Sequence, residues 1–183
     1  MDKSLINPFF TVRISLIFLL TWSHTLMAAE PYKSILNAVP NAQLVGQARM
    51  SYLFWDVYDV ALFAPNGKWA ENQPYALTLT YLRELKGEDI AKRGIEEMQK
   101  QGFTDQQKLN DWLQQMEQLF PDVRDQTVLI GIADEQQHSH FFHRDTYLGA
   151  VEDIEFTQQF FGIWLHPNTS EPKLRRQLLG NKP

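Results

Sequence analysis

The order of secondary-structure signals in the sequence predicts an α+β fold, in which an antiparallel sheet is covered by a layer of helices. Three strand-like segments come first, two helical segments follow, and two or three strands and two more helices complete the chain. Grouped strands and grouped helices distinguish this class from the regular alternation of strand and helix in α/β proteins. We expect the strands to pair antiparallel, because consecutive strands usually lie side by side.

Length and composition narrow the classes of function. The chain has 183 residues, a formal net charge of −5, 13% aromatic residues and no cysteine. Without cysteine there is no disulfide framework, thiol nucleophile or thiolate metal site. An acidic chain that has no basic run is a poor candidate for binding nucleic acid. A globular enzyme, a binding module and an interaction protein remain.

Residues 1–29 have the pattern of a secretory signal peptide. A basic start is followed by an uncharged apolar run, ISLIFLLTW at residues 14–22, and by small residues that end at Ala29. This run is shorter than the roughly 20 apolar residues that cross a membrane. We predict cleavage after Ala29 and a single domain over residues 30–183. The mature protein is then expected in the periplasm or outside the cell, with no stable membrane span and no cysteine for a lipoprotein anchor. An uncleaved signal anchor is the alternative.

The first half of this domain predicts three strands. Residues 44–53 and 56–64 are rich in Val, Tyr, Phe and Leu and contain no proline. Turn residues at 65–67 (PNG) follow the second segment. Residues 75–84 alternate between an apolar face and a threonine face. The apolar face comprises Tyr75, Leu77, Leu79 and Tyr81.

Helical periodicity follows in residues 88–101 and 104–120. The second segment has the clearer apolar stripe, which comprises Leu109, Trp112, Leu113, Met116 and Phe120. Thr104 and Gln107 have the spacing of a capping box, so we expect the helix to begin there. Pro121 predicts its end.

Strand-like segments return over residues 127–133, 138–144 and 146–149, with a hairpin between the first two. His138 and His140 share one face of the second segment, and two imidazoles can bind a metal ion. No carboxylate motif accompanies them. We therefore expect a polar strand face, with no metal and no cofactor.

Residues 154–165 predict an unusually aromatic helix, whose large rings are Phe156, Phe160, Phe161 and Trp164. Dense packing against the sheet accounts for these rings. The alternative is that some of them line a cleft or a surface that docks a protein partner. Ser170 is expected to cap a last short helix over residues 171–179.

Three stretches carry a family pattern. They are VGQAR (45–49) with VYDVALF (57–63), LTYLR (79–83), and FGIWL (161–165) with LR (174–175) and LLG (178–180). These stretches resemble the bacterial chalcone isomerase-like family, from about residue 44 to residue 180. The resemblance implies an open-faced β-sandwich with a largely apolar cleft between sheet and helices. The wider superfamily contains true isomerases and non-catalytic fatty-acid-binding proteins.

The resemblance implies a set of polar catalytic residues in the isomerases. This chain matches the arginine of that set, at Arg49. The positions of a threonine, a tyrosine and an asparagine-like residue align with Tyr58, Ile90 and a site near Glu97. Stabilising an oxyanion needs several donors aimed together, so we expect this set to have lost catalysis. An isomerase or lyase acting on an unknown substrate is the alternative.

The fatty-acid-binding members are more similar, because they keep an arginine and a tyrosine at the ligand carboxylate, which Arg49 and Tyr58 match. A guanidinium can bind a carboxylate through two hydrogen bonds, and a phenol adds a third. Arg83 is a second candidate cation, at the end of the apolar face of residues 75–84. We therefore predict a non-catalytic domain that binds an apolar carboxylate such as a fatty acid.

Both arginines have a simpler interpretation. Arg49 shares a strand face with Gln47 and Ser51, which is consistent with a position in solvent. Arg83 could extend to the edge of the sheet and leave its charge in water. The sequence names no protein partner.

Overall fold

The structure, a computed structural model, describes residues 31–181. The predicted signal peptide lies outside the described residues. Within them, six strands and five helices follow one another in an order that confirms the predicted fold class. The strands are β1 (Ala42–Tyr52), β2 (Trp55–Pro65), β3 (Tyr75–Tyr81), β4 (Val128–Ala133), β5 (Ser139–His143) and β6 (Thr146–Val151). The helices are α1 (Lys33–Ala38), α2 (Gly87–Lys100), α3 (Gln106–Leu119), α4 (Ile154–Leu165) and α5 (Pro172–Leu178).

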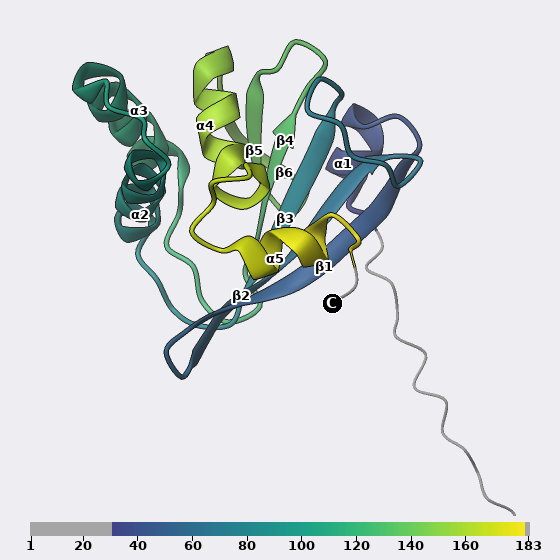
Figure 1. The fold of residues 1–183 in the computed structure, drawn as a ribbon, viewed down its shortest axis with the longest axis horizontal. Helices are drawn as coiled ribbons and strands as arrows, with labels where there is room; N and C mark the ends of the chain where they lie inside the picture. Colours follow the sequence, from purple (N-terminus) through teal and green to yellow (C-terminus); the bar gives the residue numbers. More distant parts are fainter. Residues whose placement is uncertain (1–30, 182–183) are drawn as a thin grey trace, which may run out of the picture.

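The six strands form one antiparallel sheet in sequence order, from β1 to β6. β3 and β4 are therefore neighbours, although α2 and α3 separate them in the chain (Figure 1). The alternation expected in β3 is confirmed. Tyr75, Leu77 and Tyr81 are buried on the face that the large helices cover, whereas Thr78 and Thr80 lie on the other face.

Helices cover the two faces of the sheet unequally (Figure 1). Residues of α2, α3, α4 and α5 join the main core on one face. On the opposite face, Ile35 of α1 and Val39, which follows the helix, are completely buried in a smaller cluster that includes Phe63 and Ile132. The sequence did not predict α1, because a helix of six residues with no side-chain cap has too short an apolar pattern to recognise.

The aromatic helix α4 supplies the centre of the main core. Its four large rings, Phe156, Phe160, Phe161 and Trp164, are all at least nine-tenths buried. Most of their contacts with neighbouring rings are edge to face, for example that of Phe161 and Tyr75, whose centroids are 5.0 Å apart. This geometry is favoured by the charge distribution of aromatic rings. Dense packing against the sheet is therefore confirmed for this helix, and two of its rings, Phe160 and Trp164, also line a cavity, as the alternative expected.

Two predicted helix caps are wrong. α3 is capped by Asp105, whose carboxylate accepts a hydrogen bond from a backbone amide of the first turn, and not by a box of Thr104 and Gln107. Asp is at least as good an N-cap as Thr, so the helix begins one position later. Ser170 does not cap α5, because its hydroxyl donates to the carboxylate of Glu97 instead.

Candidate functional site

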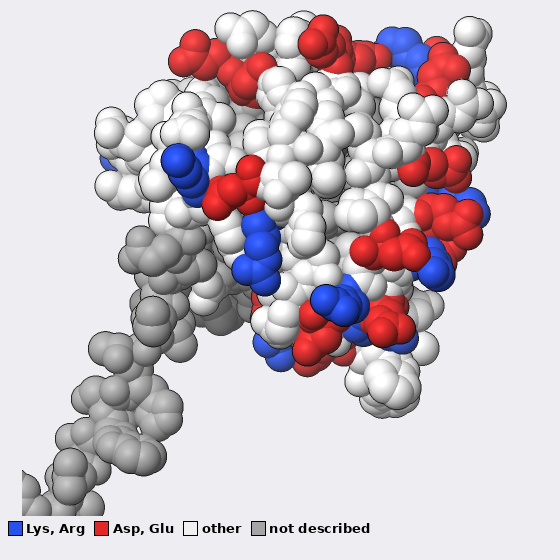
Figure 2. Space-filling model, turned by 180° about the vertical axis from the view of Figure 1, so that it is seen from behind, with Lys and Arg blue, Asp and Glu red and all other residues white. Residues whose placement is uncertain are grey.

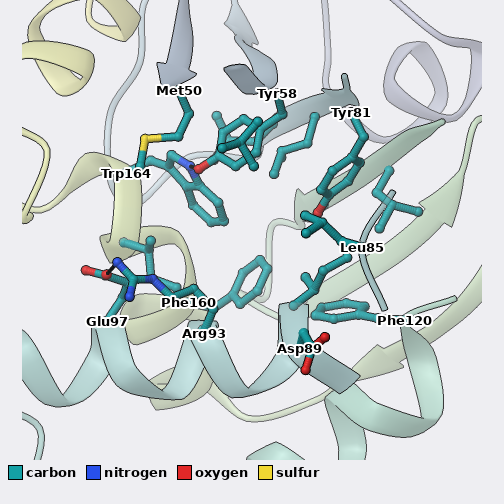
Figure 3. Close-up of a pocket in the computed structure, with 18 of the residues that line it drawn as sticks. Met50, Tyr58, Tyr81, Leu85, Asp89, Arg93, Glu97, Phe120, Phe160 and Trp164 are labelled. Carbon is teal, nitrogen blue, oxygen red and sulfur yellow. Dashed lines mark hydrogen bonds and ion pairs between the residues drawn. The ribbon is translucent and has the colours of Figure 1, made fainter. Parts of the chain in front are cut away.

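A cavity of about 370 Å³ lies between the sheet and helices α2, α4 and α5 (Figure 3). Every strand of the sheet contributes to its lining. The volume falls within the range of small-molecule pockets, which occupy roughly 300–1,000 Å³. The structure therefore contains the cleft between sheet and helices that the family resemblance implied.

The interior of this cavity is formed by aliphatic and aromatic side chains. They include Leu77, Leu79, Phe120, Phe141, Leu148 and Phe160. Several of these, such as Leu77 and Phe141, are also part of the buried core, so the walls of the cavity are held by tight packing behind them. A hydrocarbon chain placed here would gain roughly 0.8 kcal/mol for each methylene group removed from water.

Two phenols face the interior from β2 and β3, Tyr58 and Tyr81 (Figure 3). The indole of Trp164 donates a hydrogen bond of 3.1 Å to the Tyr58 hydroxyl, which leaves the phenolic proton of Tyr58 available to another acceptor. Burial raises the pKa of Tyr58 to about 12, and burial also raises the pKa of Tyr81. Both phenols therefore stay protonated at neutral pH and act as hydrogen-bond donors.

The mouth of the cavity carries charged side chains, among them Arg83 and Arg93. Arg93 is already occupied, because its Nη2 lies 2.6 Å from Oε1 of Glu97. Arg83 stacks over the ring of Trp55, with its guanidinium carbon 5.5 Å from the ring centroid. Within the described part of the chain, Arg83 makes no ion pair with an acidic side chain. It is thus a cation at the mouth that remains available to an anion.

Glu97 is a buried carboxylate in the wall of the cavity. It accepts hydrogen bonds from Ser170 at 2.6 Å and from Lys100 at 3.1 Å, and it pairs with Arg93. Burial alone would raise the pKa of Glu97, but these hydrogen bonds and the neighbouring positive charges outweigh burial and lower it. The ionised carboxylate ties α2 to the loop before α5, and its oxygens are occupied by these partners.

The sequence pointed to Arg83 and to the region of Glu97, but it did not predict a charged row on α2. Asp89, Arg93 and Glu97 are spaced four residues apart, so they lie along one side of the helix, and all three line the cavity. This i, i+4 spacing is the signal that could have identified them.

Arg49 lies on the opposite face of the sheet from the cavity. Its guanidinium is 2.6 Å from Asp59 and 3.0 Å from Asp56, beside a separate surface groove that Thr78 and Thr80 also line. The structure thus brings Tyr58 and Arg83 together at one cavity and places Arg49 elsewhere.

The two candidate metal-binding histidines share a carboxylate. His140 Nε2 lies 2.8 Å from Asp134, and His138 Nδ1 lies 4.0 Å from the same oxygen. Among residues 31–181, no group of three or more His, Cys, Asp or Glu side chains is arranged to hold a metal ion. Over the same residues, no helix combines the length and the apolar character that crossing a membrane requires.

The fold and the cavity together define an open-faced sheet protein with an apolar pocket. The model of the chalcone isomerase-like family matches residues 37–180, so the chain belongs to this family. A protein of Haemophilus influenzae, described as uncharacterized, is 34% identical over 155 residues, which cover 80% of this chain and 73% of that protein. The crystal structure of a fatty-acid binding protein of Arabidopsis thaliana matches with a TM-score of 0.60 and 12% identity, over 78% of this chain and 88% of that one. At this identity, the similarity concerns the fold.

Proposed function

We propose that this protein is an exported, non-catalytic domain whose cavity holds one apolar carboxylate, such as a fatty acid. The observation that carries the proposal is the cavity itself, which combines an apolar interior with an available cation, Arg83, at its mouth. The fold shared with the fatty-acid binding protein of Arabidopsis supports the same class of ligand. The signal-like sequence of residues 1–29 supports export.

In this proposal the acyl chain occupies the interior and the carboxylate stays at the mouth. A carboxylate buried without a counter-charge would be costly, and the phenols of Tyr58 and Tyr81 supply donors but no positive charge. At the mouth, the guanidinium of Arg83 can bind both carboxylate oxygens. The two phenols are then available to an oxygen atom carried further along the ligand.

The absence of catalysis in the proposal is supported by the position of the polar groups. Arg49, the residue that matches the isomerase arginine, lies across the sheet from the cavity and is paired with two aspartates. Glu97 is ionised, but its oxygens are engaged by Ser170, Lys100 and Arg93. Among the described residues, the interior therefore offers the phenols of Tyr58 and Tyr81 as donors without the isomerase arginine beside them, so the set of donors that would stabilise an oxyanion is incomplete.

Native mass spectrometry of the protein purified from expressing cells tests this proposal. We expect the folded protein to carry or take up one equivalent of palmitic acid, because the cavity offers a single apolar site beside Arg83. Spectra of the same sample under denaturing conditions give the N-terminus, which we expect at Glu30. A clean ligand-free mass, with no uptake when palmitic acid is titrated, would sink the proposal.

A further inference from the structure

The hairpin between β1 and β2 projects beyond the body of the molecule, and its end is apolar (Figure 1). Tyr52, Leu53, Phe54 and Trp55 are 61%, 77%, 97% and 64% exposed, and we call these four residues the hairpin tip. In Figure 2 the projecting end is free of charge, and acidic and basic side chains gather behind it. Scattered exposed apolar residues are normal, but four in succession on a projection mark an interaction site.

The backbone geometry of the hairpin tip does not itself favour these apolar residues. Leu53 has a φ of 55°, in the left-handed region that Asn and Gly adopt far more readily than Leu. Short hairpin turns are built mainly from Asn, Asp and Gly for this reason. Two bulky side chains, Leu53 and Phe54, are thus placed in a strained, solvent-facing turn where they contribute no core packing. Such strain is typical of functional positions.

The hairpin tip is continuous with the mouth of the cavity. Tyr52 belongs to the tip and also lines the cavity, and Trp55 lies beneath the guanidinium of Arg83. The acids beside the tip, Asp56 and Asp59, are both paired with Arg49, which reduces their repulsion of an anionic surface. The tip therefore borders the mouth of the cavity beside Arg83.

We propose that the hairpin tip inserts into the surface layer of a lipid bilayer, and that the ligand passes between bilayer and cavity there. The second part of this inference rests on the proposed function. Leu53 and Phe54, the outermost side chains, would enter the acyl region, while Tyr52 and Trp55 would lie at the headgroups, where such amphipathic rings are enriched. A turn of two residues reaches only a few ångströms beyond its flanking pair, which suits an interfacial depth.

The size and shape of the hairpin tip favour a bilayer over a protein partner. Each partner in a standard protein interface buries roughly 800 Å². Four side chains on a convex projection do not supply that area by themselves. They do supply what an interfacial anchor needs, because a few apolar and aromatic side chains at a projecting end can enter lipid without a complementary surface.

Binding to vesicles of phosphatidylcholine and phosphatidylglycerol tests the inference. The full chain is expressed in cells, and the protein is purified with whatever N-terminal processing the cells have carried out. Lipids brominated at the start of their acyl chains, next to the headgroups, quench an indole that lies at this depth, and a Trp55→Phe variant identifies the share of the signal from Trp55. We expect Leu53→Ser/Phe54→Ser to weaken vesicle binding at least tenfold and to remove the quenching. The matched control is Leu36→Ser/Ile154→Ser, which changes two side chains that are 55% and 51% exposed elsewhere and should bind as wild type.

A second variant separates the effect of the hairpin tip on vesicle binding from its effect on stability. Asn suits the left-handed backbone of residue 53, so Leu53→Asn should raise the thermal midpoint while it weakens vesicle binding. Equal vesicle binding by the wild type and the double serine variant, or no quenching of Trp55 in the wild type, overturns the inference. So does a dimer in sedimentation velocity that the double variant loses, because the tip would then bind a second copy.

Uptake of palmitic acid offered in solution without vesicles distinguishes this inference from the proposed function. We expect equal uptake by the wild type and the double serine variant, because the cavity itself is unchanged. Failure of the wild type to take up palmitic acid would overturn the proposed function, and vesicle binding would still decide the bilayer contact. Loss of uptake in the double variant alone would make the tip a part of the cavity wall and overturn its role as an anchor.

Discussion

A tryptophan in place of Leu79 is expected to weaken fatty-acid binding by about a hundredfold. Leu79 lines the cavity from β3, paired with Val60 on β2 and Leu129 on β4. An indole there would occupy the space of the acyl chain, and the loss of roughly three or four methylene contacts gives this factor. Because the new ring enters an existing cavity, the cost to stability should stay below about 2 kcal/mol. Titration with a fluorescent fatty acid measures the effect.

The matched control is Thr80→Trp, one residue further along the same strand. Thr80 lies on the opposite face, in the groove beside Arg49 and Asp59. Binding should be unchanged in this variant. Loss of binding in Thr80→Trp, with normal binding in Leu79→Trp, would move the ligand to the other face of the sheet.

Replacing Gly46 by Ala is expected to lower the free energy of unfolding by about 2 kcal/mol or more. A Cβ atom on Gly46 would overlap the carbonyl oxygen of Gln177 and lie 2.6 Å from that of Leu178. Backbone cannot give way as a side chain can, so α5 would have to move off β1 and expose Leu178, which is completely buried. A fully buried leucine contributes roughly 1.5–3 kcal/mol. Denaturation in urea measures the change.

A glycine that has room provides the comparison. Gly94 lies inside α2, where an added Cβ would meet Met116 at an ordinary contact distance of 3.6 Å. Ala is preferred to Gly in a helix interior by roughly 0.5–1 kcal/mol, so Gly94→Ala should be neutral or stabilising. If Gly46→Ala unfolded at the same urea concentration as the wild type, the close approach of α5 to β1 would be wrong.

Long periodic segments were predictable from the sequence because many residues report the same pattern. The bounds predicted for the aromatic helix, 154–165, are those of α4, and its first turn is capped by Asp153. The faces of β3 were likewise predictable, because its alternation spans the whole strand. Local signals were less reliable, since at Thr104 and Ser170 several polar residues competed to cap one helix.

The positions of Arg49 and Tyr58 could not be predicted, because they depend on one extra residue in the hairpin. Tyr52 pairs with Trp55 and Ser51 with Asp56, and this register, if continued, would place Arg49 opposite Tyr58. The register shifts after Ser51, so Met50 pairs with Tyr58 and Arg49 with Asp59. A shift of one residue reverses the face on which a side chain lies. Arg49 and Tyr58 therefore point to opposite faces of the sheet.

The measurement that tests the central claim most directly compares Arg83→Gln with Arg49→Gln in one fatty-acid titration. The claim is that the carboxylate binds at the mouth of the cavity. A hydrogen bond to a charged group contributes roughly 1.5–3 kcal/mol, so Arg83→Gln should weaken binding at least tenfold. A fatty alcohol of equal length, which carries no charge, should lose much less.

Arg49→Gln should keep the affinity of the wild type, because its guanidinium is paired with Asp56 and Asp59 on the other face of the sheet. Tenfold weaker binding in Arg83→Gln and unchanged binding in Arg49→Gln is the result we predict. Weaker binding in Arg49→Gln, with no change in Arg83→Gln, would contradict the account.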